Sequence, residues 1–519
     1  MDAISLEVFR HRCAAIAEEM GAALERSAFS SNIQERRDYS CALFDAHGAL
    51  VAQAAHIPVH LGAMPRSVEA AIAHCGPLVD GDVVLLNDPF AGGTHLPDFT
   101  SVAPVFVDGT LIAYSATRAH HADVGGMTPG SMPLSRSLYQ EGIIIPPIKL
   151  IAAGQRNDAV FALIVRNSRT SDERSGDLAA QLACHQIAAA RVSELVTKMG
   201  VAALTAGFDS LISYGEQRMC QLIQSIPDGK YCATEYLDDD GVDTGLLAIT
   251  VTLTIQHDQL LIDFAGSAPQ CRGPLNAPQA VTESAVLYAL RILEGDDMPA
   301  SAGVYRPLTW HIPVGSLLNP LPPAAVAGGN VETSQRVVDV MLAALAQAIP
   351  TRIPAQSAGT MNNWTMGGMR SDHTPFAYYE TLGGGMGARP TAAGLDAVQT
   401  HMTNTRNTPV EAFERLYPVR VTQLAVRPDS GGVGQCNGGA GLCKSIQFLV
   451  PVTVTLLTER RVLAPQGVKG GGAGSCGQNS TCDSEGAITP LAGKGSFEFP
   501  AGTTLHILTP GGGGYGEPA

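Results

Sequence analysis

An Asp-Gly dipeptide at residues 108 and 109 most constrains what this chain can fold into. It separates two runs of β-forming residues, "SVAPVFV" (101–107) and "TLIAYSAT" (110–117). Asp-Gly between such runs is the strongest short-range indication of a two-residue hairpin turn. If residue 107 pairs with residue 110, the hairpin brings "RAHHAD" (118–123) beside "THLPD" (94–98). Two groups of His and Asp side chains are therefore predicted to lie next to each other.

The same pairing predicts a register for these groups. It places Asp98 opposite Ala119 and His120 opposite Pro97, and opposed residues have Cβ atoms roughly 4.5–5.5 Å apart. Strict pleating puts Asp98 on the face of Ala119 and His121. Pro97, however, has no N–H for the ladder and should interrupt regular pairing. The pattern leaves open which of the two histidines converges on Asp98.

The segment before the hairpin is a Gly/Pro-rich loop with ligand-type side chains. "NDPFAGGTHLPD" (87–98) carries Asn87, Asp88, His95 and Asp98 directly after a short apolar run at 82–86. Loops that crowd such side chains between ordered elements often hold functional sites. Imidazoles and carboxylates at bonding distance suit a divalent metal with an open position, where bound water ionises near neutral pH. The alternative is that these residues only hydrogen-bond the loop to its neighbour.

The length of 519 residues exceeds what one hydrophobic core normally serves, so two or three domains are expected. Hydrophobic residues make up 45% of the chain and charged residues 16%, which is typical of a globular protein. From about residue 230 the sequence becomes rich in β-forming runs separated by Gly-rich connections. We predict an α+β fold, with a mixed α/β domain at 1–229 that carries the candidate metal site and a β-rich region with helices at 230–519.

Hydrophobic periodicity predicts the main elements. Apolar residues recur every three or four positions within 4–28, which predicts an amphipathic helix. A second helix is predicted from about 178 to 199, with Asp177 as its N-cap and Gly200 as its C-cap. Helices are also expected at 279–294 and 333–349, and strands at 40–45, 49–54 and 82–86 and within 246–255, 259–266, 445–457 and 503–508.

Charge and cysteine content exclude several classes of protein. The net charge of −15, the absence of a Lys/Arg run and an aromatic content of 5% argue against nucleic-acid binding. A charged amphipathic N-terminus, and no apolar run near the roughly 20 residues of a span, argue against a membrane protein. Eleven irregularly spaced cysteines favour reduced thiols in a cytoplasmic protein, although Cys476 and Cys482 lie close enough in sequence to pair.

Three glycine clusters, at 383–387, 470–474 and 511–514, raise the question of phosphate binding. None has the strand–loop–Lys context that a phosphate loop requires, and the chain contains no GxxxxGK[ST] motif. We therefore predict that these clusters form tight turns or allow close packing of backbones.

Several ordered motifs resemble those of the hydantoinase B/oxoprolinase family. "NDPFAGGTHLPD" is followed by "AHHADVGGMTPGS" (119–131) and "EGIIIPPIKL" (141–150). The likeness continues through "GDLAAQ" (176–181), "DFAGSAP" (263–269), "LNPLPPAAVAGGNVETSQRV" (318–337), "YETLGGGMGAR" (379–389) and "PGGGGYG" (510–516). So many matches in order, over nearly the whole chain, are specific for the family and much less so for the substrate.

The resemblance implies a ligand set. It implies that Asp38, His95, Asp98 and His120 bind one divalent metal, zinc or manganese, and so chooses His120 over His121. His121 and Asp123 are then the acid/base candidates. Asp38 lies in "QERRDYS" (34–40), where the alternative is a surface ion pair with a neighbouring arginine, Arg36 or Arg37.

The resemblance also implies a reaction and a partner. The chain would be the metal-dependent subunit of an ATP-dependent cyclic amidohydrolase that opens a hydantoin, 5-oxoproline or another lactam ring. A separate A-type subunit of sugar-kinase/actin-like fold would use ATP to phosphorylate the substrate, within a hetero-oligomer. The alternatives are a subunit of an ATP-dependent ketone carboxylase acting on acetone or acetophenone, and a non-catalytic scaffold for the ATP-using subunit.

Overall fold

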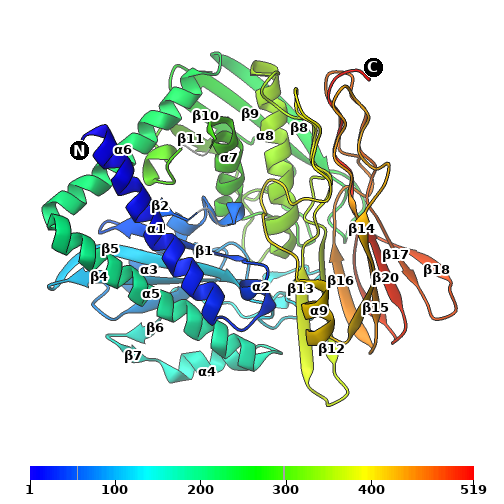
Figure 1. Ribbon diagram of the computed structural model, residues 1–519, viewed down its shortest axis with the longest axis horizontal. Coiled ribbons are helices and arrows are strands. Elements are labelled where there is room, and N and C mark those ends of the chain that lie inside the picture. Colours follow the sequence, from blue (N-terminus) through cyan, green and yellow to red (C-terminus); the bar gives the residue numbers. More distant parts are fainter. Residues whose placement is uncertain (55–56, 296–297, 519) are drawn as a thin grey trace.

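The computed structural model describes residues 1–54, 57–295 and 298–518, and it confirms the α+β class with four sheets in those residues (Figure 1). The first sheet has the strand order β2-β1-β5-β4-β3-β6-β7. Its strands are β1 (Tyr39–Asp45), β2 (Leu50–Gln53), β3 (Val83–Leu86), β4 (Asp98–Val107), β5 (Thr110–His120), β6 (Ile148–Ala152) and β7 (Gln155–Arg156). The hairpins predicted at residues 40–54 and around Asp108-Gly109 are both present.

Helices cover both faces of this sheet because its central strands are apolar on both faces. Alternate residues of β1, such as Cys41 and Leu43, pack with α1 (Ala3–Ser27) and α5 (Ser171–Met199). The intervening residues, Ala42 and Phe44, pack with α3 (Met64–Cys75) on the opposite face. Figure 1 shows α1 and α5 lying across β1, β4 and β5. Burial on both faces fixes the strand register, since a slip of one residue would exchange the two faces.

Helix α5 begins earlier than predicted. It runs from Ser171 rather than about 178, so Asp177 lies inside the helix and is not its N-cap. The Asp177 carboxylate instead accepts hydrogen bonds from the backbone N–H groups of Phe29, at 2.7 Å, and Ser30, at 3.0 Å. Asp177 therefore caps the turn at Phe29 and Ser30, which lies far away in the sequence. The local sequence around Asp177 does not reveal this contact. The predicted C-terminal end is confirmed, because Gly200 has φ +80°.

A second sheet follows α6 (Val201–Gln224). Its order is β11-β10-β9-β8, formed by β8 (Gly229–Leu237), β9 (Leu247–Gln256), β10 (Gln259–Asp263) and β11 (Leu308–His311). One face of β9 is buried at alternate residues. That face packs in one hydrophobic core with α7 (Gln279–Glu294) and α8 (Ser334–Ala348), the two helices predicted for this half.

Two further sheets form a sandwich at the C-terminus (Figure 1, right). One is β13-β12-β16-β19, from β12 (Asn363–Met369), β13 (Pro375–Glu380), β16 (Val452–Leu457) and β19 (Lys494–Phe499). The other is β14-β15-β20-β17-β18, from β14 (Val419–Val426), β15 (Leu442–Phe448), β17 (Gln478–Cys482), β18 (Ile488–Leu491) and β20 (Thr504–Leu508). Trp364, Tyr378, Phe413, Ile446 and Leu505 fill the core between the sheets.

Short elements connect these layers. They are α2 (Ser31–Gln34), α4 (Asp158–Arg166), α9 (Val410–Leu416), the single turns η1 (Pro58–His60), η2 (Leu138–Gln140) and η3 (Ala302–Tyr305), and the π-helical η4 (Gly329–Thr333) that leads into α8. All eleven cysteines lie among the described residues and are free thiols, as the irregular spacing predicted.

The glycine clusters serve close backbone packing, as predicted. A Cβ on Gly385 would collide with the carbonyl oxygen of Gly439, and one on Gly512 with that of Met386. The loops also hydrogen-bond one another, for example through Gly512 N–H and Gly439 O at 2.9 Å. Only glycine allows main chains to approach so closely.

No single helix among the described residues is both long and apolar enough to cross a membrane, although α5 and α6, bent by 109°, meet that criterion as a pair.

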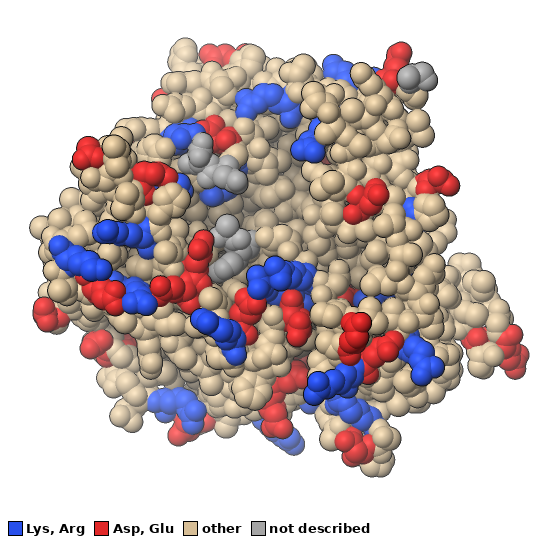
Figure 2. Space-filling model, viewed as in Figure 1, with Lys and Arg blue, Asp and Glu red and all other residues tan. Residues whose placement is uncertain are grey.

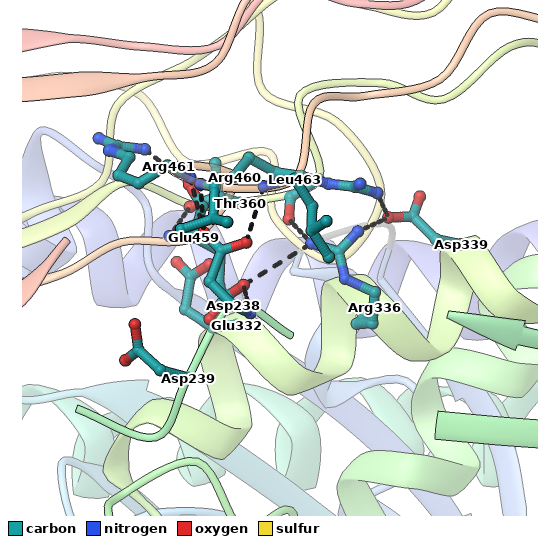
Figure 3. Close-up of polar contacts among 12 residues, drawn as sticks. Asp238, Asp239, Glu332, Arg336, Asp339, Thr360, Glu459, Arg460, Arg461 and Leu463 are labelled. Carbon is teal, nitrogen blue, oxygen red and sulfur yellow. Dashed lines mark hydrogen bonds and ion pairs between the residues drawn. The ribbon is translucent and has the colours of Figure 1, made fainter. Parts of the chain in front are cut away.

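A buried ionic cluster joins the second sheet, α8 and the loop that follows β16 (Figure 3). Asp238, directly after β8, accepts backbone N–H groups from Arg461 at 2.6 Å and from Val462 and Leu463 at 3.1 Å. Arg336 and Arg460 both pair with Asp339 Oδ2 from α8, at 2.5 and 2.7 Å. Buried charges are tolerated only when they are paired in this way.

Replacing Asp238 with Ala should lower the stability of the whole chain. The substitution leaves three partly buried N–H groups of the 461–463 segment without an acceptor, at a cost of about 1–3 kcal/mol. Thermal and urea unfolding followed by circular dichroism would measure the shift. Asp239→Ala is the matched control, because the Asp239 carboxylate is 35% exposed and its pair with Lys494 is longer, at 3.4 Å. Equal midpoints for both variants would contradict the role given to Asp238.

Glu332 should make stability depend on pH. Burial, reinforced by the nearby Glu459 carboxylate, raises the pKa of Glu332 to about 8. The folded protein therefore keeps this proton up to about pH 8, whereas the unfolded chain loses it near the ordinary value of about 4.3. The contribution of Glu332 to the free energy of unfolding therefore falls as pH rises from about 4.3 to about 8. The unfolding temperature of Glu332→Gln, relative to wild type, should rise between pH 5 and pH 8 and level off above it; a constant difference would contradict the raised pKa.

Candidate metal centre

Three strands of the first sheet bring the predicted ligands together. Asp98 is the first residue of β4 and His120 the last residue of β5, and the two are paired in the ladder. β1 lies on the other side of β5, where Tyr39 pairs with Ala119. Asp38, just before β1, therefore lies beside His120, whose N–H donates to the Asp38 carbonyl at 3.0 Å.

The predicted register was wrong by one residue, and a β-bulge explains the difference. Val107 pairs with Thr110 and Phe106 with Leu111, as counting from the turn predicts, but Val105 then pairs with Ala113. The extra residue moves Asp98 from the predicted Ala119 to His120. The bulge thus decides between the two histidines, which the sequence pattern left open. The ladder ends at Asp98, next to Pro97, where an interruption was expected.

His95, Asp98 and His120 form a compact buried group. Their potential ligand atoms lie within 4.8 Å of one another, and His95 Nε2 is 3.2 Å from Asp98 Oδ1. Thr94 donates to the other carboxylate oxygen, Oδ2, at 2.7 Å, and Asn330 does so at 3.4 Å. Among the described residues, both ring nitrogens of His95 and the Nε2 atom of His120 have no hydrogen-bond partner. Unpartnered buried imidazoles facing a carboxylate fit a divalent cation.

A cavity of about 20 Å³, enough for one or two water-sized species, lies beside this group. Asp98 and His120 line it together with Asp38, Asn330 and Tyr379, whereas His95 is not part of its lining. Asp38 pairs with Arg36 at 4.0 Å, while Arg37 pairs with Glu25. The ion pair considered for Asp38 is therefore present, but it is buried and not at the surface.

His60 lines the same cavity and was missed by the sequence analysis. It lies on η1, its Nε2 is 3.5 Å from Asp98 Oδ2, and its Nδ1 is 2.9 Å from Ser40 Oγ. A single histidine after "IPV" (57–59) carries no spacing pattern, so only its position near Asp98 identifies it.

The charges in the cavity are strongly perturbed by burial. Burial alone would raise the pKa of Asp98, but His95 and His60 hold it well below its ordinary value. Burial and the neighbouring His95 lower the pKa of His120, so its ring is neutral at pH 7. Burial raises the pKa of Asp38, and Arg36 partly offsets that effect. A neutral imidazole beside an ionised carboxylate is the protonation state in which both bind a metal.

Asn32 on α2 lies behind His120. Its side-chain amide is 3.1 Å from His120 Nδ1, and its carbonyl oxygen, Oδ1, is buried without a partner. With the amide turned by 180°, Oδ1 accepts the Nδ1 proton of His120. That arrangement satisfies Oδ1 and leaves the Nε2 lone pair free for a metal.

His121 and Asp123, the predicted acid/base residues, lie outside the cavity lining. His121 Nε2 is 2.7 Å from Gln181 Oε1, and its Nδ1 contacts Arg174. The Asp123 carboxylate accepts from the N–H groups of Gly125 and Gly130 and pairs with Arg169 at 3.0 Å. These partners give both residues a role in fixing the 121–131 segment, and their acid/base roles stay a prediction.

A larger cavity of about 400 Å³ lies next to the small one. Ile57 lines both, and the larger cavity is also lined by Gln53, Pro58, Leu61, Tyr288, Arg291, Ile292 and Asn404. Figure 2 shows that the face of Figure 1 is hollowed near its middle, with acidic and basic side chains mixed around the hollow. Ile57 therefore separates the larger cavity from the small one.

Comparison with known proteins matches residues 2–518 to the family described as Hydantoinase B/oxoprolinase. The chain belongs to this family. The resemblance inferred from the sequence motifs is therefore confirmed.

Two relatives of different length illustrate the match. 5-Oxoprolinase 1 of Arabidopsis thaliana is 41% identical over 544 residues, which cover 99% of this chain and 42% of that protein. The chain thus spans less than half the length of this relative. A putative D-/L-hydantoinase subunit of Pseudomonas sp. (strain NS671) is 32% identical over 538 residues, which cover 100% of this chain and 90% of that protein.

Solved structures share the fold. The ATP-dependent caprolactamase from Pseudomonas jessenii aligns with a TM-score of 0.93 at 28% identity and covers 100% of this chain and 91% of that one. Acetone carboxylase aligns with a TM-score of 0.92 over 100% of this chain and 76% of that one. Its identity is only 18%, so this second likeness shows the fold alone.

Substitutions of Asn32 should change metal affinity without altering a predicted ligand. In the turned orientation Asn32 Oδ1 accepts from His120 Nδ1–H, so Asn32→Leu removes that acceptor and should weaken manganese or zinc binding about 10- to 100-fold. Asn32→Asp supplies a stronger acceptor and should bind at least as tightly as wild type. Isothermal titration of metal-depleted protein would measure both affinities, and unfolding temperatures would control for folding. Wild-type affinity in the Leu variant would exclude the proposed contact.

Proposed function

We propose that this chain is the metal-dependent subunit of a cytoplasmic, ATP-dependent cyclic amidohydrolase that opens a hydantoin, 5-oxoproline or another lactam ring. The observation that carries the proposal is the buried His95–Asp98–His120 group, which has unpartnered ring nitrogens and of which Asp98 and His120 line a small cavity. The relatives named a hydantoinase subunit, a 5-oxoprolinase and a caprolactamase support a cyclic amide as substrate.

Ligand roles follow from the contacts. Asp98 would coordinate through Oδ1, because Thr94 and Asn330 occupy Oδ2. His95 and His120 would each provide a ring nitrogen, and Asp38 completes the proposed set from the far side of β5. A divalent cation held by these residues supplies Lewis acidity and lowers the pKa of a coordinated water. Zinc and manganese both accept such N and O ligands.

A lactam carbonyl resists attack because resonance stabilises the amide, so prior activation is needed. We propose that an A-type partner of sugar-kinase/actin-like fold transfers the γ-phosphoryl group of ATP to the amide oxygen. Water then adds to the activated carbon, the ring C–N bond breaks, and phosphate leaves. The net change is ring plus ATP plus water to the ring-opened acid, ADP and phosphate; the acid is an amino acid from a lactam and an N-carbamoyl amino acid from a hydantoin. Burial of the His95–Asp98–His120 group would limit the access of bulk water to the bond that reacts beside it.

The relative lengths of the homologues support a partner. The chain spans 90% of the putative D-/L-hydantoinase subunit, and only 42% of 5-oxoprolinase 1. The extra length of 5-oxoprolinase 1 leaves room for an ATP-using part in the same chain. A subunit of hydantoinase type would need that part on a second chain. We therefore propose a hetero-oligomer.

Removal of one ligand should abolish metal and turnover together. Wild type co-expressed with its ATP-using partner should carry close to one metal per chain and open one of hydantoin, 5-oxoproline and caprolactam. His95→Ala should lose the metal, measured by plasma mass spectrometry, and at least about 100-fold in kcat/KM. Tyr378→Phe serves as control, since Tyr378 is buried and does not line the cavity.

Three results would overturn parts of the proposal. Full activity in metal-free wild type would exclude a role for a metal and would leave the 94–98 loop with only a structural role. Bicarbonate-dependent consumption of acetone without ring opening would identify a carboxylase instead. Full turnover by the partner with His95→Ala would leave this chain as a scaffold.

A further inference from the structure

Apart from the histidines, Tyr379 is the only aromatic residue among the described side chains that line the small cavity. Its ring stacks on His120 with centroids 4.5 Å apart and an interplanar angle of 13°. The Arg36 guanidinium lies 4.7 Å from the Tyr379 ring centroid and donates to the Tyr379 carbonyl at 2.9 Å. These contacts hold the ring rigidly against a proposed metal ligand.

The Tyr379 hydroxyl is 2.9 Å from Asn363 Oδ1, and the orientation of that amide is fixed by its own partners. Asn363 Nδ2 donates to Glu332 Oε1 at 2.6 Å and to the Leu457 carbonyl at 3.0 Å. Both amide hydrogens are thus committed to oxygen acceptors. Oδ1 must therefore accept from Tyr379, and the single hydroxyl hydrogen of Tyr379 points at Asn363.

Glu332 fixes the position of Asn363, and through it that of the Tyr379 hydroxyl. Its Oε1 atom accepts from Asn363 and from the N–H of Met361 at 3.0 Å, and Met361 also lines the cavity. Figure 3 shows Glu332 beside Asp238, within the ionic cluster that joins α8 to the C-terminal sandwich. The orientation of Tyr379 is therefore set by the buried junction between the sheets, not by the loop that carries the proposed ligands.

The commitment of its hydrogen limits how the Tyr379 hydroxyl can hydrogen-bond within the cavity. Since its hydrogen is committed to Asn363, the oxygen can act toward the cavity only as an acceptor. The cavity of about 20 Å³ holds one or two waters but not a lactam ring, so the matching donor is a water O–H.

We propose that Glu332 and Asn363 are positioning residues that hold the Tyr379 oxygen as the acceptor for the water consumed in ring opening. The inference rests on the proposed function, because it assigns a role in the hydrolytic step. The water would lie between the Tyr379 oxygen and the Asp98 and His120 side chains that line the same cavity, with one O–H directed at Tyr379 and its lone pairs free for attack.

Tyr379→Phe tests the acceptor while keeping the ring that stacks on His120. Assayed with the ATP-using partner, the variant should retain wild-type metal content and a KM within about two-fold. Its kcat should fall about 10- to 100-fold, because the attacking water is no longer oriented. Tyr378→Phe is the matched control: this adjacent buried tyrosine loses a comparable hydrogen bond, to Thr408 at 3.0 Å, away from the cavity.

The positioning residues are tested by non-additivity and by conservative replacement. Asn363→Ala should lower kcat in wild type but add little in the Tyr379→Phe background, because both changes disrupt one contact. Glu332→Gln keeps an oxygen acceptor for Asn363 and should retain kcat within about two-fold, whereas Glu332→Leu should not. Unfolding temperatures of all variants would establish that assays are run on folded protein.

Two outcomes would overturn the inference. Wild-type kcat in Tyr379→Phe would show that the hydroxyl has no role, and loss of metal in that variant would show that it acts on the ligands instead. If wild type opens no ring, the proposed function fails, and a high-resolution crystal structure still decides the inference. A water within about 3.2 Å of the Tyr379 oxygen in wild type, lost in Tyr379→Phe, would support it, and its absence from wild type would refute it.

Discussion

The bulged pairing of β4 with β5 is the constraint on which the candidate site depends. One extra residue near the turn moves Asp98 opposite His120, and the neighbouring β1 then places Asp38 beside them. Because both faces of this sheet are buried by helices, the register cannot slip to relieve local strain. The geometry of the site is thus fixed by packing far from the cavity, at the apolar faces of the strands.

The other side of the cavity is built by distant parts of the chain. Asn330 approaches from η4, directly before α8, while Tyr379 and Met402 approach from the C-terminal half. Arg36 ties the two sides together, since its guanidinium donates to the Tyr379 carbonyl and to Thr381 at 3.1 Å. The cavity is complete only when these distant parts of the chain are folded together, which suits the proposed chemistry on an intermediate that must be protected from water.

The second sheet, α8 and the C-terminal sandwich are held together by buried charge as well as by apolar packing. Asp238, Asp339 and Glu459 meet Arg336, Arg460 and Lys494 where three parts of the fold join. Buried ion pairs contribute little net stability compared with apolar packing, but a mispaired arrangement is costly. The cluster therefore specifies one docked geometry, and through Glu332 and Asn363 it also fixes a side chain of the cavity.

The sequence by itself determined the types of the elements it predicted and the hairpin at Asp108-Gly109, because turn chemistry and periodicity are local. Its ordered motifs identified the family and the loop that carries His95 and Asp98. It did not determine that Asp177 caps a distant turn, that His60 and Tyr379 line the cavity, or which residue lies opposite Asp98. Those features arise from contacts between residues far apart in the chain. A bulge of one residue, invisible to counting from the turn, decided the pairing of Asp98 and His120, because only packing of the whole sheet selects its register.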